Sequence, residues 1–287
     1  MIYLALSIIF ATSIYITFKL SEQFSCNLFS IIIYNYLTAS ILGFGFLLNF
    51  KIANSLLYHP WTYIAILVGL LFTGMFFIIG LSSRKAGIAI TTVASKMSMV
   101  IPVLFSIFYF SEEIFLIKSI GLFLAVVAVF LSLYKKGKNN FKSLIFVLPI
   151  VIFFGTGIID TLVKFAQHLK IPENETPEFT SLVFLVALIS GIIAAIFKKI
   201  PFKNFIHTPT LLFGILLGIS NFGSLFFLIK ALNLSKLDSS IVFAIINMVI
   251  VVLSLITGYF LFKEKLSKIN LLGIFLAFLS LYLISYS

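Results

Sequence analysis

Long apolar runs, separated by short polar breaks, constrain the fold of this chain more than any other feature. A helix needs about 20 apolar residues to cross the hydrocarbon core of a bilayer. These runs exceed the roughly ten residues of a membrane-barrel strand, and they do not alternate as such a strand does. The sequence therefore predicts an all-α integral membrane protein with ten transmembrane helices. The ten runs fall near residues 2–20, 28–49, 61–82, 86–110, 114–134, 144–166, 178–197, 209–232, 237–262 and 266–286.

Composition argues against several other protein classes. Hydrophobic residues make up 61% of the chain and charged residues 10%, which is less than half the charged fraction of a typical soluble domain. The net charge of +11 does not indicate a nucleic-acid partner, because the lysines are scattered between apolar runs, where bilayer topology explains them. The single cysteine, Cys26, can build neither an intrachain disulfide nor a thiolate metal cluster. No Walker motif is present, so we expect no direct use of ATP. We also expect no cofactor and no metal.

An internal repeat divides the chain. Residues 69–85 (GLLFTGMFFIIGLSSRK) match 214–230 (GILLGISNFGSLFFLIK), and each segment begins with glycine and ends with lysine. Further on, Glu112 pairs with Glu264 and Gly121 with Gly273, both at an offset of 152 residues. Apolar composition alone can produce some resemblance, but matched glycines and charges favour a duplication. We therefore predict two five-helix repeats, residues 1–136 and 143–287. Because five is odd, the second repeat is inverted, as in secondary transporters that bind substrate at the repeat interface.

The order of small residues, proline, glutamate and glycine in both halves resembles the drug/metabolite transporter superfamily, EamA type. The residues that carry this resemblance are Gly80-Leu81, Ala86-Gly87, Pro102, Glu112 and Gly121, then Ala231, Ser239-Ser240, Glu264 and Gly273. The resemblance spans essentially the whole chain. It implies a basket of helices around a central cavity, lined by helices 1 to 4 and 6 to 9. Two positions depart from the pattern: Ser254 replaces the proline matched by Pro102, which puts a symmetric kink in doubt, and Lys96 is not called for, which suggests an unusual substrate.

Lys96 is the most informative single residue. It lies ten residues into the run 86–110, or about 15 Å along a helix and near the middle of the ~30 Å hydrocarbon layer. A lysine facing lipid there costs about 2.5–3.5 kcal/mol, and its stem is too short to reach the surface. We therefore expect a wet cavity or a partner, and two polar residues lie close to it in the helix: Thr92 one turn earlier on the same face, and Ser95 next to it in the sequence.

Several roles remain open for Lys96. It is a cationic anchor for an anionic or zwitterionic substrate, a carrier of a coupling proton, or a structural residue. In the structural case it is a neutral buried lysine or is paired with Asp160, the only acid deep in a span. A helix that starts at a different residue would also move Lys96 away from the bilayer centre.

Other polar residues at depth are weaker candidates for substrate binding. They are Asn221, Asn247 and Tyr36, and Asn247 aligns with Ser95 at the offset of 152. For each, the alternative is an interhelical hydrogen bond, typically worth about 0.6 kcal/mol. No catalytic residue is expected, because the spans hold no histidine and no HExxH motif. Glu112 and Glu264 lie at helix junctions, where we expect them to cap the helices that follow.

These features together predict a secondary active transporter, an exporter or an exchanger, that moves a small polar metabolite such as an amino acid by alternating access. A lipid flippase or a non-transporting membrane scaffold is the alternative. The expected partners are the solute and the lipid bilayer, and no oligomeric state is indicated. High Lys, Ile, Phe and Asn content is typical of an AT-rich bacterial genome, which suggests a bacterial inner membrane. Loops after odd-numbered spans hold 13 Lys or Arg and the other loops 6, so the positive-inside rule places both termini outside. The family resemblance implies both termini inside.

Overall fold

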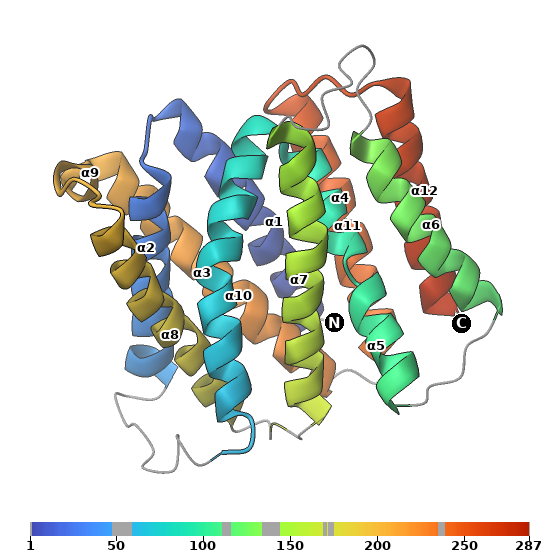
Figure 1. Ribbon diagram of the computed structural model, residues 1–287, viewed down its shortest axis with the longest axis horizontal. Helices are drawn as coiled ribbons and strands as arrows, with labels where there is room; N and C mark the ends of the chain where they lie inside the picture. Colours follow the sequence, from blue (N-terminus) through green and yellow to red (C-terminus); the bar gives the residue numbers. More distant parts are fainter. Residues whose placement is uncertain are drawn as a thin grey trace. The chain divides into compact units, whose positions relative to one another are not determined.

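The computed structural model describes residues 2–47, 59–110, 116–133, 144–168, 171, 175–234 and 239–286, and these form helices without any strand (Figure 1). The prediction of an all-helical chain is therefore confirmed for the described residues. The first half holds α1 (Ile2–Gln23), α2 (Leu28–Ser40), the π-helix η1 (Ile41–Leu47), α3 (Thr62–Lys85), α4 (Ile88–Met97), α5 (Val100–Phe110) and α6 (Leu116–Leu133). The second half holds α7 (Leu144–His168), α8 (Thr176–Phe197), α9 (Lys203–Ile206), α10 (Thr208–Leu234), α11 (Ser239–Phe260) and α12 (Lys268–Tyr286).

Each predicted apolar run contains helix. Among the described residues, seven helical segments are long and apolar enough to cross a membrane. Three shorter apolar helical stretches, at 119–132, 245–260 and 268–284, occupy the remaining predicted runs. A chain with seven such segments is a multi-pass membrane protein, and the count of ten spans stays a prediction.

Local sequence signals explain where the helices begin. Asn27 caps α2, because its Oδ1 accepts the backbone N–H of Ser30 at 3.1 Å. At the start of α12, Ser267 and Asn270 satisfy each other: the Ser267 N–H donates to Asn270 Oδ1 at 2.9 Å, and the Asn270 N–H donates to Ser267 Oγ at 3.2 Å. Gly87 precedes α4 with a φ of 102°, a left-handed conformation that favours glycine.

The chain forms two compact units, and each unit draws on both halves of the sequence. Unit 1 comprises Met1–Gly80 and Leu162–Leu234, and unit 2 comprises Leu81–Thr161 and Ser235–Ser287. Helices α3 and α7 each contribute residues to both units. The predicted repeats, 1–136 and 143–287, describe sequence similarity rather than compactness, and that division stays a prediction.

In unit 1, α10 packs against both α1 and α2, and α2 also packs against α8 (Figure 1). Small residues on α10 allow this close approach. A Cβ added to Gly218 would lie 2.5 Å from the carbonyl oxygen of Asn35, and a Cβ added to Gly214 would lie 3.2 Å from that of Ile31. The glycine pair therefore serves helix packing, as the spacing Gly214-xxx-Gly218 predicts.

In unit 2, α6 and α12 lie side by side (Figure 1). A Cβ added to Gly121, near the start of α6, would lie 3.1 Å from the carbonyl oxygen of Ser280, near the end of α12. A Cβ added to Gly273, near the start of α12, would lie 2.9 Å from the carbonyl oxygen of Ala128, near the end of α6. The two helices therefore run antiparallel. Gly121 and Gly273 are equivalent at the offset of 152 residues, and so are Ala128 and Ser280. The two glycine–carbonyl contacts are therefore equivalent as well.

Candidate functional site

The predicted run 86–110 forms two helices with a break at residues 98–99, two residues after Lys96. The Ser98 N–H donates to the carbonyl of Lys96 as the cap of α4, and the Met99 N–H lies 3.4 Å from the same oxygen. Pro102 explains the break, because it has no N–H to donate to the carbonyl of Ser98 and its ring would clash there. Discontinuous helices of this kind line the binding sites of membrane transporters.

Lys96 lies in the last turn of α4, and its depth in the membrane stays a prediction. It is the only residue from Thr91 to Val100 whose side chain is not buried. Its ammonium group stands at the end of α4 where backbone carbonyls concentrate, and this end of a helix favours a cation. The end of α4 is therefore a favourable place for a basic side chain.

Asp160 approaches the break from α7. The Ser98 hydroxyl lies 3.5 Å from Asp160 Oδ2, and the Thr156 hydroxyl, one turn earlier on α7, lies 3.5 Å from the carbonyl oxygen of Ser95. The Lys96 ammonium attracts the Asp160 carboxylate electrostatically. Among the ion pairs of the described residues, however, none joins these two side chains directly. Asp160 therefore reaches the break through Ser98, without a direct ion pair to Lys96.

Two further predicted residues lie beside α4. Asn247 of α11 is buried, and its Nδ2 lies 3.7 Å from the sulfur of Met99, within the break. Thr92 is buried one turn before Lys96, and its hydroxyl donates to its own helix at the carbonyls of residues 88 and 89, both at 3.0 Å. Unit 2 thus brings together Lys96, Ser95, Asp160 and Asn247, whereas the hydroxyl of Thr92 is already occupied.

The remaining predicted residues, Asn221 and Tyr36, belong to unit 1. Asn221 is buried on α10, and its Nδ2 donates to Asn35 Oδ1 on α2 at 3.2 Å. This is the interhelical hydrogen bond that the sequence offered as the alternative to substrate binding. Tyr36 is fully buried between the rings of Phe76 and Phe184, and its hydroxyl has no hydrogen-bond partner in the described part of the chain. Tyr36 therefore keeps a polar group available inside unit 1.

Sequence reasoning missed Ser98 and Thr156, which connect the residues around the break. Thr156 precedes Asp160 by four residues on α7, so helical periodicity places both on one face. That spacing was a usable signal. Ser98 carried no comparable signal, because its contact with Asp160 depends on the break itself.

Glu264 caps a helix, but not the helix that follows it in the sequence. Its Oε1 accepts the N–H of Ile88 at 2.7 Å and its Oε2 accepts the N–H of Ala89 at 3.3 Å, at the start of α4. The prediction that it caps the following helix is therefore wrong, since α12 is capped by its own side chains at 267 and 270. The carboxylate fits because Gly87 leaves room: a Cβ there would lie 2.9 Å from it. Glu112 lies outside the described residues.

Comparisons with known proteins agree with this architecture. The model of the EamA-like transporter family matches residues 141–286, about half of the chain. An uncharacterised protein of Haemophilus influenzae is 28% identical over 292 residues, which cover 99% of this chain and 97% of that protein. A crystal structure that is 15% identical in sequence superposes with a TM-score of 0.64 over 99% of this chain and 96% of its own, so the two share a fold. The resemblance seen in the sequence is confirmed: this chain belongs to the EamA-like transporter family, a membrane transporter family of the drug/metabolite transporter superfamily.

Proposed function

We propose that the chain is a secondary active transporter, an exporter or an exchanger, of a small anionic or zwitterionic metabolite such as an amino acid. The observation that carries the proposal is the Lys96 ammonium, partly exposed at a break in a membrane helix. A carboxylate of the solute would pair with this ammonium. The Asp160 carboxylate, which has no direct ion pair with Lys96 in the described chain, would take the amino group of a zwitterion or a coupling proton.

Alternating access follows from the predicted repeats. We infer that residues 1–136 and 143–287 are inverted copies that exchange roles as the site opens to each side of the membrane. The reciprocal contacts of Gly121 and Gly273 support this inference, because they pair equivalent residues of two antiparallel helices. We place the protein in a bacterial inner membrane. The bacterial relative supports this location.

The test is uptake of labelled amino acids into vesicles that contain the purified protein. Lys96→Met removes the cation and keeps a chain of similar length, so we expect transport at subsaturating solute to fall at least tenfold. That expectation rests on the roughly 1.5–3 kcal/mol of a hydrogen bond to a charged group. Lys85→Met is the matched control, because Lys85 is exposed in the last turn of α3, outside the site. Equal uptake by both variants would refute the proposal.

A double variant separates substrate binding from a structural role. If Lys96 and Asp160 only stabilise each other, each single neutral variant leaves a buried charge and is unstable, by about 3–5 kcal/mol. Lys96→Met with Asp160→Asn would then restore both stability and transport. If Lys96 binds the solute, the double variant folds but does not transport. A solute-dependent rise in unfolding temperature that disappears in Lys96→Met would support the binding role, and a rise with lipids alone would favour a flippase or a scaffold.

A further inference from the structure

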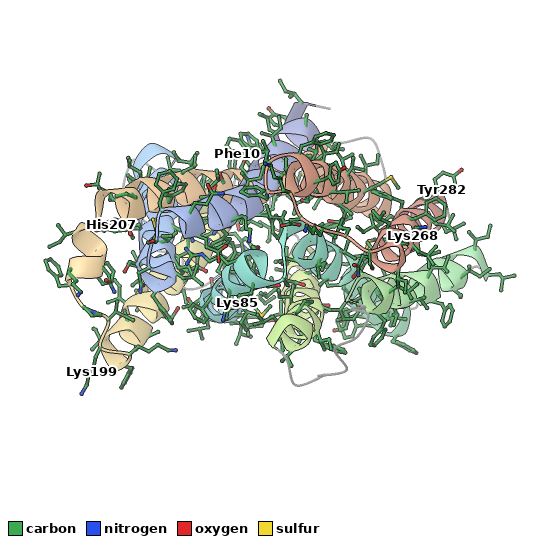
Figure 2. All side chains as sticks on the ribbon, turned by 90° about the horizontal axis from the view of Figure 1, so that it is seen from above. Phe10, Lys85, Lys199, His207, Lys268 and Tyr282 are labelled. Carbon is green, nitrogen blue, oxygen red and sulfur yellow. The ribbon has the colours of Figure 1, made fainter. Side chains whose placement is uncertain are left out.

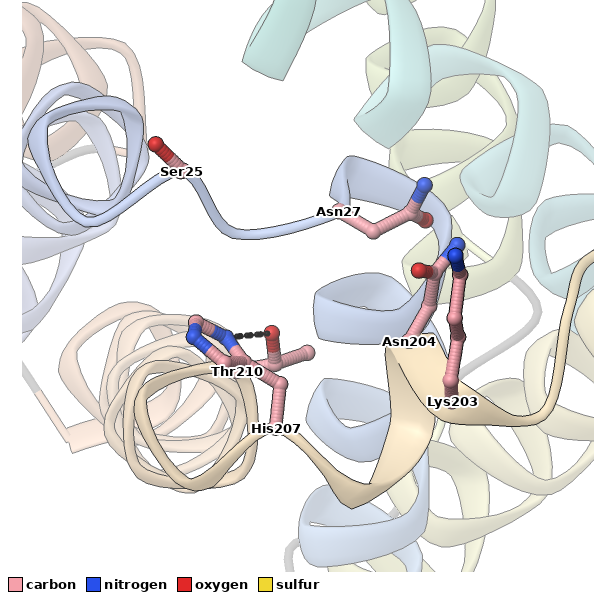
Figure 3. Close-up of a pocket in the computed structure, with 6 residues that line it drawn as sticks. All are labelled: Ser25, Asn27, Lys203, Asn204, His207 and Thr210. Atoms are coloured by element: carbon pink, nitrogen blue, oxygen red, sulfur yellow. Dashed lines mark hydrogen bonds between the residues drawn. The ribbon is translucent and has the colours of Figure 1, made fainter.

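A polar pocket lies at one end of unit 1, and none of its lining residues belongs to the candidate site of unit 2. It has a volume of about 200 Å³ and is formed by the turn between α1 and α2, by α9 and by the start of α10 (Figure 3). Among the residues that the structure describes, every residue in its lining is polar or basic, and none is acidic. The lining residues are Ser25, Asn27, Lys203, Asn204, His207 and Thr210.

Hydrogen bonds fix the walls of this pocket. The Tyr34 hydroxyl on α2 donates to the carbonyl of Phe205 at 2.9 Å, which holds α9 against α2. His207 Nδ1 lies 3.0 Å from the hydroxyl of Thr210, drawn as the dashed line in Figure 3. Asn27 uses its Oδ1 to cap α2, so its amide nitrogen remains to serve as a donor. The pocket is therefore a fixed set of donors rather than a chance gap between loops.

Lys203 supplies the charge of the pocket. Figure 3 shows its side chain and that of Asn204 directed toward Asn27. Two other lysines lie nearby on the same connection and do not line the pocket: Lys198 stands 4.9 Å from the ring centroid of Phe29, and Lys199 points outward in Figure 2. The carboxylate nearest in sequence, Glu22, pairs with Lys19 at 3.0 Å. One ammonium and several neutral donors, with no acid in the lining, select an anion.

The surroundings of the pocket match the headgroup layer of a membrane. It lies where α1 and α8 end and where α2 and α10 begin, next to large apolar residues that remain exposed: Phe24 is 52%, Phe202 76% and Ile206 67% exposed. Aromatic and aliphatic side chains beside a lysine at helix ends are typical of the membrane–water interface. The two connections that form the pocket follow the predicted spans 2–20 and 178–197, the first and the seventh. Loops after odd-numbered spans are the set richer in Lys and Arg.

We propose that this pocket is a phosphate-binding site that takes the headgroup of an anionic phospholipid. Its volume is below the roughly 300–1,000 Å³ of pockets that hold drug-sized ligands, so it suits a phosphate ester of a small alcohol rather than a nucleotide. Basic pockets between membrane helices on the positively charged side of a protein bind such headgroups. A free phosphate monoester offers the same chemistry from solution, and the experiment below distinguishes the two sources.

The experiment measures the thermal unfolding of the full chain in detergent during titration with four probes. The probes are phosphatidylglycerol, phosphatidylcholine, glycerol 3-phosphate and inorganic phosphate. We expect a saturable rise in unfolding temperature with phosphatidylglycerol and none with phosphatidylcholine. In Lys203→Gln the concentration for half the effect should rise about tenfold, as expected for loss of one charge-assisted hydrogen bond.

Matched variants make the result specific to the pocket. Lys199→Gln removes the same charge from the same connection and should leave the phosphatidylglycerol titration unchanged. Lys203→Arg keeps the charge and should retain the effect even if Lys203→Gln folds poorly. If Lys203→Gln and Lys199→Gln change the phosphatidylglycerol titration equally, this pocket is not the binding site. If glycerol 3-phosphate raises the unfolding temperature and phosphatidylglycerol does not, the pocket binds a free phosphate monoester and the proposal of a lipid headgroup is wrong.

Discussion

Removal of the Glu264 carboxylate tests the packing of unit 2 most directly. This one side chain accepts two backbone N–H groups at the start of α4, at 2.7 and 3.3 Å. A hydrogen bond to a charged group is worth about 1.5–3 kcal/mol, and partial exposure of Glu264 lets water replace part of it. We therefore expect Glu264→Ala to cost about 2 kcal/mol. Glu264→Gln should cost about 1 kcal/mol, because it keeps one acceptor oxygen and loses the charge opposite the helix dipole.

The assay is thermal unfolding of the purified protein in detergent. At roughly 2–4 °C per kcal/mol, Glu264→Ala should lower the unfolding temperature by about 4–8 °C and Glu264→Gln by about 2–4 °C. Glu22→Gln is the matched control, since Glu22 is an exposed carboxylate that pairs with Lys19 one turn away, and it should shift the temperature by less than about 1 °C. If Glu264→Ala and Glu22→Gln unfold at the same temperature, the cap contributes nothing and the reasoning is wrong.

Two further predictions use the repeat and the helix contacts of unit 2. The offset of 152 residues predicts that Glu112 caps α11 as Glu264 caps α4, so Glu112→Gln should lower the unfolding temperature as much as Glu264→Gln; a shift no larger than that of the exposed control would contradict the repeat. Gly273→Ala should destabilise by about 1–3 kcal/mol, because its Cβ would meet backbone atoms of α6 at 2.5 and 2.9 Å. In Gly74→Ala the new Cβ meets nothing within 4 Å, so that variant should unfold at or slightly above the wild-type temperature.

The helices were predictable because each depends on its own sequence. Apolar runs of membrane-spanning length gave edges close to those observed, for example 144–166 for α7 and 178–197 for α8. The same count placed Lys96 near the middle of one run, 86–110, whereas the structure divides that run and places Lys96 in the last turn of α4. The glycine contacts of α10 with α2 were predictable too, since small residues at a spacing of four permit close packing whichever helix is the partner.

Contacts between residues far apart in the sequence were harder to predict. Glu264 caps a helix that begins 176 residues earlier, and no local pattern indicates that contact. Pro102 favours the break at residues 98–99 but does not by itself predict it. Many membrane helices tolerate a proline without losing a turn, because neighbouring helices satisfy the freed backbone groups. Asn221 donates a hydrogen bond to Asn35, a partner that sequence spacing alone does not identify, and its role in substrate binding stays a prediction.

The two halves agree where they pack and differ at the candidate site. Gly121 and Gly273 make equivalent contacts, whereas the break in the first half has no counterpart in α11, which is continuous from Ser239 to Phe260. The offset of 152 places Ser254 where the first half has Pro102, and Ser254 is buried without a hydrogen-bond partner in the described chain. The same offset aligns Met248 with Lys96 in the sequence, so the second half has no charge at this position. Among the described residues, the lysine and the helix break thus occur in the predicted run 86–110 and not at the equivalent positions of α11. An asymmetric site of this kind would fit a solute whose two ends differ, such as an amino acid with its carboxylate toward Lys96 and its amino group toward Asp160.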